Sequence, residues 1–237
     1  MTKPNVIEMH DITKKFGEFV ANDHINLDVR PGEIHALLGE NGAGKSTLMN
    51  MLAGLLQLQS GTIKVNGQVV SIDSPSKATK LGIGMVHQHF MLVEAFTVAE
   101  NIILGSEVTK SGGVLDMKRA VKEITELSQR YGLAVDPSAK VADISVGAQQ
   151  RVEILKTLYR GADILIFDEP TAVLTPSEIT ELLNIMRLWL RKVSLLSLSP
   201  ISWMKFVRFL IVLRLSDVVS QLIQLLSKGL QMPIWLR

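Results

Sequence analysis

Apolar and polar residues alternate along the first part of the chain, as they do in half-buried strands. The alternation runs through residues 6–12 and again through residues 19–29. Two later runs, residues 34–38 and 164–167, are almost wholly apolar, which is typical of strands buried on both faces. The pattern therefore predicts two half-buried strands followed by two fully buried ones.

Between the strands, apolar residues recur at helical spacing. Helices are predicted at residues 48–55, 98–104, 117–131 and 148–159, and from Pro176 onward. Residues 60–67 are predicted to form a strand that runs into a hairpin turn with Asn-Gly at its tip. Because strands and helices alternate, we expect a mostly parallel, twisted α/β sheet.

Composition narrows the class of protein. The chain has 237 residues, which favours one large domain, or one domain with a subdomain. It has no cysteine, which excludes disulfide scaffolds, cysteine-ligated zinc and thiol catalysis. The first ten residues lack the apolar core of a signal peptide, so we expect a cytoplasmic start.

Charge is unevenly distributed along the chain. Residues 1–185 carry 17 basic and 22 acidic side chains, whereas residues 186–237 carry eight basic side chains and one acid, Asp217. The pI of about 8.8 therefore comes from the end of the chain. The mildly acidic first part gives no support for a nucleic-acid partner.

Residues 39–46 fit the pattern G-x-x-x-x-G-K-[ST] and lie between a predicted strand and a predicted helix. Glycines let backbone N–H groups close around phosphate oxygens, and the helix N-terminus adds a favourable dipole. Lys45 would bring a positive charge to the β- and γ-phosphates, and the Ser46 hydroxyl would ligate Mg²⁺. The alternative is a glycine-rich turn that matches by chance, which the correct flanks on both sides disfavour.

An acidic pair, Asp168 and Glu169, directly follows the apolar run at 164–167. Alone, such a pair is usually part of a solvated loop. After a phosphate-binding loop, Asp168 fits the carboxylate that supports the Mg²⁺ site. Glu169 then fits the base that polarises the attacking water.

Four further segments bear on the family: residues 144–151 (I-S-V-G-A-Q-Q-R), residues 172–175 (A-V-L-T), Gln88 and Phe16. With the two motifs above, and in this order, they make residues 1–188 resemble the ATP-binding subunit of an ABC transporter. That family has its signature L-S-G-G-Q-Q-Q-R, its dimer-contacting S-A-L-D, its glutamine loop and its adenine-stacking aromatic at these four places. The resemblance implies an α/β fold with a P-loop NTPase (RecA-like) core, an N-terminal antiparallel β subdomain and an α-helical signature subdomain.

The resemblance also assigns site residues. ATP would be bound by Phe16, Gly39, Glu40, Asn41, Gly42, Ala43, Gly44, Lys45, Ser46 and Thr47, and by Ser145 and Gly147, which would reach the γ-phosphate held by an opposing subunit. Mg²⁺ would be held by Ser46, Gln88 and Asp168. Glu169 and Gln88 would be the catalytic residues. Taken singly, Gln88 reads as a surface residue, Phe16 as core and Ser145 as an ordinary helix N-cap.

Departures from the family pattern resemble one branch of it. Val146 replaces the first signature glycine, Ala148 replaces a glutamine, and residues 172–175 lack the aspartate of S-A-L-D. That branch energises importers of simple sugars and nucleosides and usually carries two such domains in one longer chain, so this sequence resembles the first half. The implied partners are transmembrane permease subunits, a second nucleotide-binding domain and, indirectly, a substrate-binding lipoprotein or periplasmic protein. The implied location is peripheral, on the cytoplasmic face of the bacterial inner membrane.

The resemblance ends at about residue 188, which leaves residues 189–237 as an atypical basic and apolar tail. No histidine follows His89, although the family places a switch histidine after an interior strand here. Charged residues interrupt every window long enough to span a membrane, and a basic amphipathic surface helix is a second alternative.

We favour a reading-frame shift near Leu188. In the frame one base earlier, Trp203 to Phe206 encode Asp-Glu followed by Ile or Val, and allowed codons for residues 199–209 can spell T-H-K-L-D-E-I-R-A-V. These are the residues that the family has here, histidine included. Without the interior strand and the histidine, we expect a chain that folds poorly and hydrolyses ATP weakly or not at all.

Two alternatives remain open for the function. One is a soluble, non-transport ABC ATPase that acts on nucleic acid or ribosomes. The other is a non-functional remnant of a disrupted gene.

Overall fold

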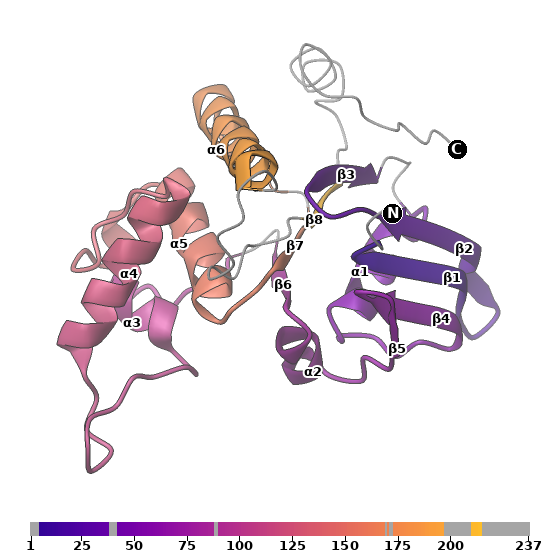
Figure 1. The fold of residues 1–237 in the computed structure, drawn as a ribbon, viewed down its shortest axis with the longest axis horizontal. Helices are drawn as coiled ribbons and strands as arrows, with labels where there is room; N and C mark the ends of the chain where they lie inside the picture. The colour runs from indigo at the N-terminus through magenta and orange to yellow at the C-terminus, as the bar shows by residue number, and fades with distance from the viewer. Residues whose placement is uncertain are drawn as a thin grey trace.

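The computed structural model describes residues 5–37, 42–87, 90–168, 170, 173–196 and 210–214. These residues form two four-stranded sheets and the helices that pack beside them (Figure 1). The strands are β1 (Ile7–Phe16), β2 (Phe19–Val29), β3 (Glu33–Leu37), β4 (Ser60–Val65), β5 (Gln68–Val70), β6 (Ile83–Val86), β7 (Ile164–Phe167) and β8 (Leu210–Arg214). The helices are α1 (Lys45–Leu52), α2 (Pro75–Lys80), α3 (Val98–Ile103), α4 (Met117–Tyr131), the 3₁₀ helix η1 (Val141–Asp143), α5 (Val146–Tyr159) and α6 (Pro176–Leu196).

The N-terminal sheet has the strand order β2-β1-β4-β5, and each pair of neighbours is antiparallel. Its β4–β5 hairpin turns at Asn66 and Gly67, whose φ angles are 51° and 78°. Two positive φ angles in a two-residue turn match the right-handed twist of the strands, which is why Asn-Gly occurs there. The predicted antiparallel β subdomain and its hairpin are therefore confirmed.

The second sheet is parallel throughout, with the order β3-β8-β7-β6. Strand β7 is apolar at every position because both of its faces are buried. Ile164 and Ile166 pack in one hydrophobic core, and Leu165 and Phe167 pack in another. Side chains of a strand alternate between faces, so a strand between two cores has no polar face.

The two cores divide the molecule. One lies between the N-terminal sheet, α1 and one face of the parallel sheet, and it includes Ile7, Met51 and Ile63. The other lies on the opposite face, beneath α3, α4, α5 and α6. In Figure 1 the N-terminal sheet and the cluster of α3, α4 and α5 accordingly stand on opposite sides of β3, β8, β7 and β6.

Strand β8 corrects one expectation. The sequence was expected to lack an interior strand after residue 188, yet the backbone of residues 210–214 pairs in parallel with both β3 and β7. The sheet is therefore continuous from β3 to β6, and the expectation of a missing interior strand is wrong. The expected poor folding stays a prediction. The expectation of weak ATP hydrolysis then rests on the missing histidine alone.

Helix α6 crosses the expected boundary at residue 188 without a break. Trp189 is 1% exposed and belongs to the core under the helices. Its ring meets the Tyr131 ring edge-on, with centroids 6.1 Å apart, and its Nε1 donates a hydrogen bond to the Tyr131 carbonyl oxygen at 2.7 Å. The first residue of the atypical tail is thus an integral part of the fold.

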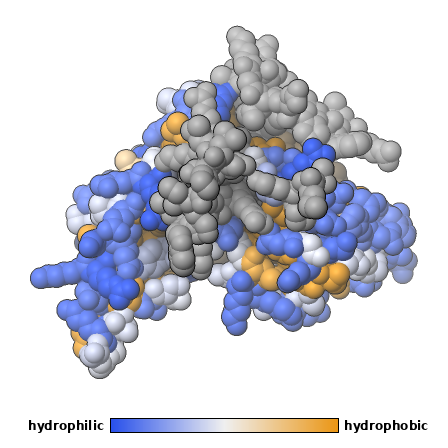
Figure 2. Space-filling view, viewed as in Figure 1, coloured by the Kyte–Doolittle hydropathy of each residue, from blue (hydrophilic) through white to orange (hydrophobic). Residues whose placement is uncertain are grey.

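Figure 2 shows a largely hydrophilic face on which apolar side chains form small separate patches. Scattered apolar side chains of this kind are ordinary on a protein surface. Within the described part of the chain, no helix combines the length and the hydropathy needed to cross a membrane.

Tyr159 provides a test of how α4 and α5 pack. Its hydroxyl donates to Glu123 Oε2 at 2.9 Å, and burial together with this bond raises the pKa of Tyr159 to about 12. Between pH 10 and 12 the unfolded chain therefore loses this proton while the folded chain keeps it, so stability falls as pH rises. We expect the Tyr159→Phe variant to show a shallower fall in its urea midpoint over that range. Tyr131, whose pKa burial also raises, should retain its own share of the dependence; identical slopes in the two proteins would contradict the assignment.

Candidate functional site

The glycine-rich loop joins β3 to α1. Residues 38–41 lie outside the described residues, so the predicted roles of Gly39, Glu40 and Asn41 stay predictions. From residue 42 the loop is described, and Gly42 and Gly44 have φ angles of +88° and +79°. Gly44 is the N-cap of α1 and brings no capping side chain. The backbone N–H groups in the first turn of α1 therefore lie at a helix N-terminus, which attracts anions.

Gly44 is also wedged against β2. A Cβ on Gly44 would lie well inside contact distance of the Ala21 carbonyl oxygen, and 2.6 Å from Asn22 Nδ2. Asn22 is 4% exposed, and its Nδ2 donates to the Gly44 carbonyl oxygen at 3.2 Å. The N-terminal sheet thereby fixes the loop. Nothing in the local sequence pattern had indicated that Ala21 and Asn22 take this part.

A pocket of about 190 Å³ opens beside this loop. It is lined by Phe16, Phe19, Ala21, Gly42, Ala43, Gly44, Lys45, Ser46 and Thr47. The structure thus brings the predicted aromatic together with the second half of the predicted phosphate loop, although 25 residues separate Phe16 from Gly42 in the sequence.

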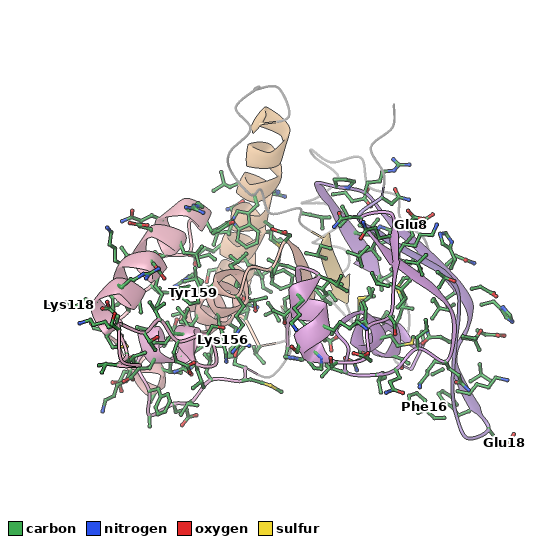
Figure 3. The ribbon with its side chains drawn as sticks, turned by 60° about the horizontal axis from the view of Figure 1, so that its bottom comes forward. Glu8, Phe16, Glu18, Lys118, Lys156 and Tyr159 are labelled. Atoms are coloured by element: carbon green, nitrogen blue, oxygen red, sulfur yellow. The ribbon has the colours of Figure 1, made fainter. Side chains whose placement is uncertain are left out.

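The aromatic part of the pocket lies at the β1–β2 turn. Phe16 and Phe19 are paired across the hairpin and are 47% and 61% exposed. Lys14 Nζ lies 5.5 Å from the centroid of the Phe16 ring. Figure 3 shows Phe16 near the turn at Glu18, far from the helices that carry Lys118, Lys156 and Tyr159. Two exposed aromatic rings leave a surface on which a flat ligand can stack. Sequence reasoning missed Phe19, which its hairpin pairing with Phe16 could have indicated.

Asp168 stands at the end of β7 that corresponds to the loop end of β3. These two strands run parallel on either side of β8, so the chain leaves both at the same edge of the sheet. Asp168 is partly buried, and its backbone N–H donates to the Val86 carbonyl oxygen at 3.1 Å. Glu169 and Gln88 lie outside the described residues, so their predicted roles stay predictions.

Ser145 and Gly147 form the N-terminal end of α5. Ser145 is the N-cap, and its hydroxyl oxygen accepts from the Ala148 amide at 3.2 Å. The Gly147 amide donates to Glu178 Oε1 at 3.1 Å. Neither residue lines the pocket beside the phosphate loop. The structure therefore does not bring this pair to that pocket of the same chain.

Polar contacts tie α5 to the segments around the other motifs. Gln150 is 3% exposed, and its Nε2 donates to the Pro170 carbonyl oxygen at 2.7 Å, two residues beyond Asp168. Lys156 Nζ donates to the Met91 carbonyl oxygen at 2.7 Å, three residues beyond Gln88. Burial lowers the pKa of Lys156. These two hydrogen bonds hold α5 against the segments at Pro170 and Met91. The sequence analysis had not indicated either contact.

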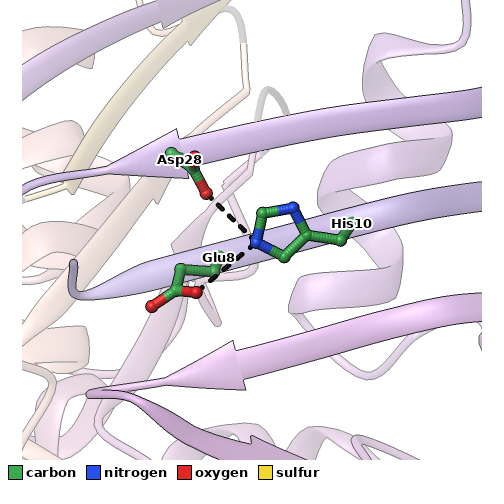
Figure 4. Close-up of side chains that lie close together, drawn as sticks. All are labelled: Glu8, His10 and Asp28. Carbon is green, nitrogen blue, oxygen red and sulfur yellow. Dashed lines mark hydrogen bonds and ion pairs between the residues drawn. The ribbon is translucent and has the colours of Figure 1, made fainter. Parts of the chain in front are cut away.

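A second cluster of titratable side chains lies on the N-terminal sheet (Figure 4). His10 Nε2 lies 3.4 Å from Glu8 Oε2 and 3.5 Å from Asp28 Oδ1. Lys64 Nζ also contacts Glu8 Oε2, at 3.2 Å, and lowers the pKa of Glu8. The Lys64–Glu8 ion pair joins β4 to β1, and the contact between His10 and Asp28 joins β1 to β2, so the cluster links three neighbouring strands.

Comparison with known families gives a match to the ABC transporter family over residues 22–172. The chain belongs to that family. The match begins in β2 and ends just after the Asp168-Glu169 pair, so it contains the phosphate loop, the Gln88 segment and α5.

The curated relatives of this chain include two import ATP-binding proteins. The nucleoside import ATP-binding protein NupA of Lactococcus lactis subsp. cremoris (strain MG1363) is 71% identical over 187 residues, which cover 79% of this chain and 37% of that protein. The guanosine import ATP-binding protein NupO of Bacillus subtilis (strain 168) is 69% identical over 182 residues, covering 77% and 36%. The chain thus spans little more than a third of the length of these relatives.

Solved structures of the ABC transporter family share the fold. MJ1267, an ATP-binding cassette in its ADP conformation, superposes with a TM-score of 0.73 at 24% identity, covering 92% of this chain and 84% of that one. The cassette cbiO1 from Clostridium perfringens gives a TM-score of 0.72 at 24% identity, covering 92% and 82%. The expected family and fold class are therefore confirmed.

Proposed function

We propose that this chain is an ATP-binding and ATP-hydrolysing part of an ABC importer for a simple sugar or a nucleoside. The observation that carries the proposal is the pocket that joins Phe16 to residues 42–47. The names of two relatives, a nucleoside and a guanosine import protein, favour the nucleoside branch. Because the chain spans about a third of these relatives, coupling to transport would belong to the longer protein and its partners.

Each part of the pocket has a role in binding ATP. Phe16 offers one ring face to adenine, while Lys14 lies near the same ring. The first amides of α1 and the Lys45 ammonium group receive the phosphates, because a helix N-terminus and a cation both favour negative charge. Gly39, Glu40, Asn41, Ala43 and Thr47 would complete the loop around them.

Ser46 and Asp168 form a donor set that suits Mg²⁺. A hydroxyl and a carboxylate are hard oxygen ligands. The strands that precede Ser46 and Asp168, β3 and β7, end at the same edge of the parallel sheet. Gln88 would add an amide oxygen. Once bound, Mg²⁺ would neutralise charge on the β- and γ-phosphate oxygens. Glu169, the residue after Asp168 in the sequence, would accept the proton of the attacking water.

Ser145 and Gly147 would serve a second nucleotide-binding domain. They are absent from the pocket of their own chain and sit at a helix N-terminus, which suits contact with a phosphate carried by an opposing domain. ATP would then draw the two domains together. The α5 contacts at Pro170 and Met91 give that closure a route to the Asp168 and Gln88 segments.

The partners would be membrane permease subunits, fed by a substrate-binding lipoprotein or periplasmic protein, at the cytoplasmic face of the inner membrane. The excess of acidic side chains in residues 1–185 disfavours a nucleic-acid partner. Purification of the longer protein from its host membranes tests this proposal. Co-purification with permease subunits would support it, and enrichment of nucleic acid or ribosomes in their place would support a soluble ATPase.

Replacing Phe16 tests the nucleotide pocket directly. Loss of aromatic stacking on a base costs about 1–3 kcal/mol, so Phe16→Ala should raise the Kd for ATP by about fivefold to 150-fold. A fluorescent ATP analogue titrated into the chain measures this affinity. Phe96→Ala is the matched control, because Phe96 is also exposed and lies outside the pocket. Equal losses in the two variants, or none in either, would contradict the assigned pocket.

We also infer that residues 189–237 are translated out of frame, following a nucleotide-binding domain at residues 1–188. The supporting observation is that similarity to the nucleoside import protein extends over 187 residues. Sequencing the DNA around codon 189 tests the inference. A base change there that restores the histidine-containing frame is expected, and an undisturbed frame would refute it.

A further inference from the structure

One carboxylate joins the two segments that would face an opposing domain. Glu178 lies in the first turn of α6 and accepts hydrogen bonds on both oxygens. Its Oε1 accepts from the Gly147 amide at 3.1 Å. Its Oε2 accepts from the Thr175 amide at 2.9 Å and the Thr175 hydroxyl at 2.8 Å. Glu178 therefore links the end of α5 to the turn before α6.

The approach of Glu178 to α5 depends on the absence of a side chain at residue 147. A Cβ there would lie only 2.5 Å from Glu178 Oε1. The Gly147 amide belongs to the first turn of a 14-residue helix, where N–H groups have no partner inside the helix and attract negative charge. Hydrogen bonds from Thr175 and Gly147, together with nearby Arg151, hold the pKa of Glu178 below its usual value. A charged carboxylate thus sits on this amide at neutral pH.

Helix capping explains only half of this arrangement. Thr175 and Glu178 have the spacing of a capping box, in which the Glu178 amide donates back to Thr175 Oγ1 at 3.4 Å. That motif accounts for the contacts of Oε2. It gives no reason for Oε1 to reach across to α5, 31 residues away in the sequence.

We propose that Glu178 is a positioning residue that occupies the Gly147 amide as a resident anion until the γ-phosphate of a second nucleotide-binding domain displaces it. This rests on the proposed function, which assigns the same amide to that phosphate. One N–H group cannot donate fully to both acceptors, so the two anions compete. The Thr175 contacts keep the displaced carboxylate close enough to return after phosphate leaves.

The neighbouring contacts allow this exchange without freeing the helix. Arg151 pairs with Glu181 at 2.8 Å, and Gln150 holds the Pro170 carbonyl oxygen. Both join α5 to the same region but do not use Gly147. Glu178 therefore sets how readily phosphate engages α5, while the other contacts keep α5 in place.

The test follows the Gly147 amide itself by NMR in the full-length, ¹⁵N-labelled chain at neutral pH. Inorganic tripolyphosphate is titrated into wild type, Glu178→Gln and Glu181→Gln. A charged acceptor makes a hydrogen bond roughly twice as strong as a neutral one. The Gly147 resonance of Glu178→Gln should therefore reach its midpoint at about threefold to tenfold lower tripolyphosphate than that of wild type. Glu181→Gln should behave as wild type.

Contrary outcomes are distinct. Equal midpoints in wild type and Glu178→Gln, or no response of Gly147 in either, would overturn the proposal. Glu178→Asp is a second variant, for the case in which Glu178→Gln fails to fold. It keeps an acid in the first turn of α6 but shortens its reach, so it should lower the midpoint as Glu178→Gln does.

A parallel titration with Mg²⁺ and ATP follows the Gly44 and Thr47 amides. Failure of those two to respond would refute the proposed function, whereas their response with unchanged Gly147 midpoints would refute only the exchange.

Discussion

Replacing Lys45 with alanine is expected to weaken the binding of ATP more than any other single change in the pocket. Lys45 is the first residue of α1 and lines the pocket with Ser46 and Thr47. Each hydrogen bond to a charged group contributes about 1.5–3 kcal/mol, and a lysine between two phosphates makes more than one. The Kd for ATP should therefore rise at least about 100-fold, which isothermal titration calorimetry can measure.

The fold itself should survive this replacement, since Lys45 does not belong to either hydrophobic core. Lys122→Ala is the matched control, because that lysine is exposed on α4 and lies outside the pocket. It should bind ATP as wild type does. If Lys45→Ala bound ATP within a few fold of wild type, residues 42–47 would not be a phosphate-binding loop.

Replacing Trp189 with alanine is expected to lower the free energy of unfolding substantially. Removing a buried tryptophan costs about 3–5 kcal/mol, because apolar burial is lost and a cavity remains. Here the ring also contacts Tyr131, and its N–H loses a 2.7 Å hydrogen bond. The free energy of unfolding, measured by urea titration of the full chain, should fall by about that amount.

The adjacent residue supplies the control for Trp189. Leu188 is 50% exposed on the same helix, so Leu188→Ala should change the free energy of unfolding by no more than about 0.5 kcal/mol. Trp189→Phe should fall between the two, because it keeps the ring contact and loses the hydrogen bond. A Trp189→Ala variant as stable as wild type would show that α6 does not pack through residue 189.

Much of the fold followed from local pattern. The fully apolar run at 164–167 predicted β7 because a strand between two cores leaves no polar face, and Asn66-Gly67 predicted a hairpin because few other residues adopt its φ angles. The glycine-rich segment was correctly expected between a strand and a helix, since its glycines, lysine and serine stand at fixed spacing there. Its binding of phosphate stays a prediction.

The contacts that complete the site were not predictable in this way. Ala21 and Asn22 meet Gly44 only because β2 lies against the start of α1, which no periodicity in β2 reveals. The sequence around Glu178 indicates only a helix-capping role. The hydrogen bond from the Gly147 amide to Glu178 forms only when α5 and α6 pack together. Strand β8 was missed for the same reason, since its place depends on its partners β3 and β7.

The interior place of β8 affects how the polypeptide acquires its structure during synthesis. On the ribosome, β3, β6 and β7 emerge before the strand that separates β3 from β7. Until residues 210–214 leave the exit tunnel, β3 has no neighbour and β7 is paired on one edge only, with β6. Unpaired edges invite pairing with other chains, so protection by chaperones is most needed between the synthesis of β7 and that of β8.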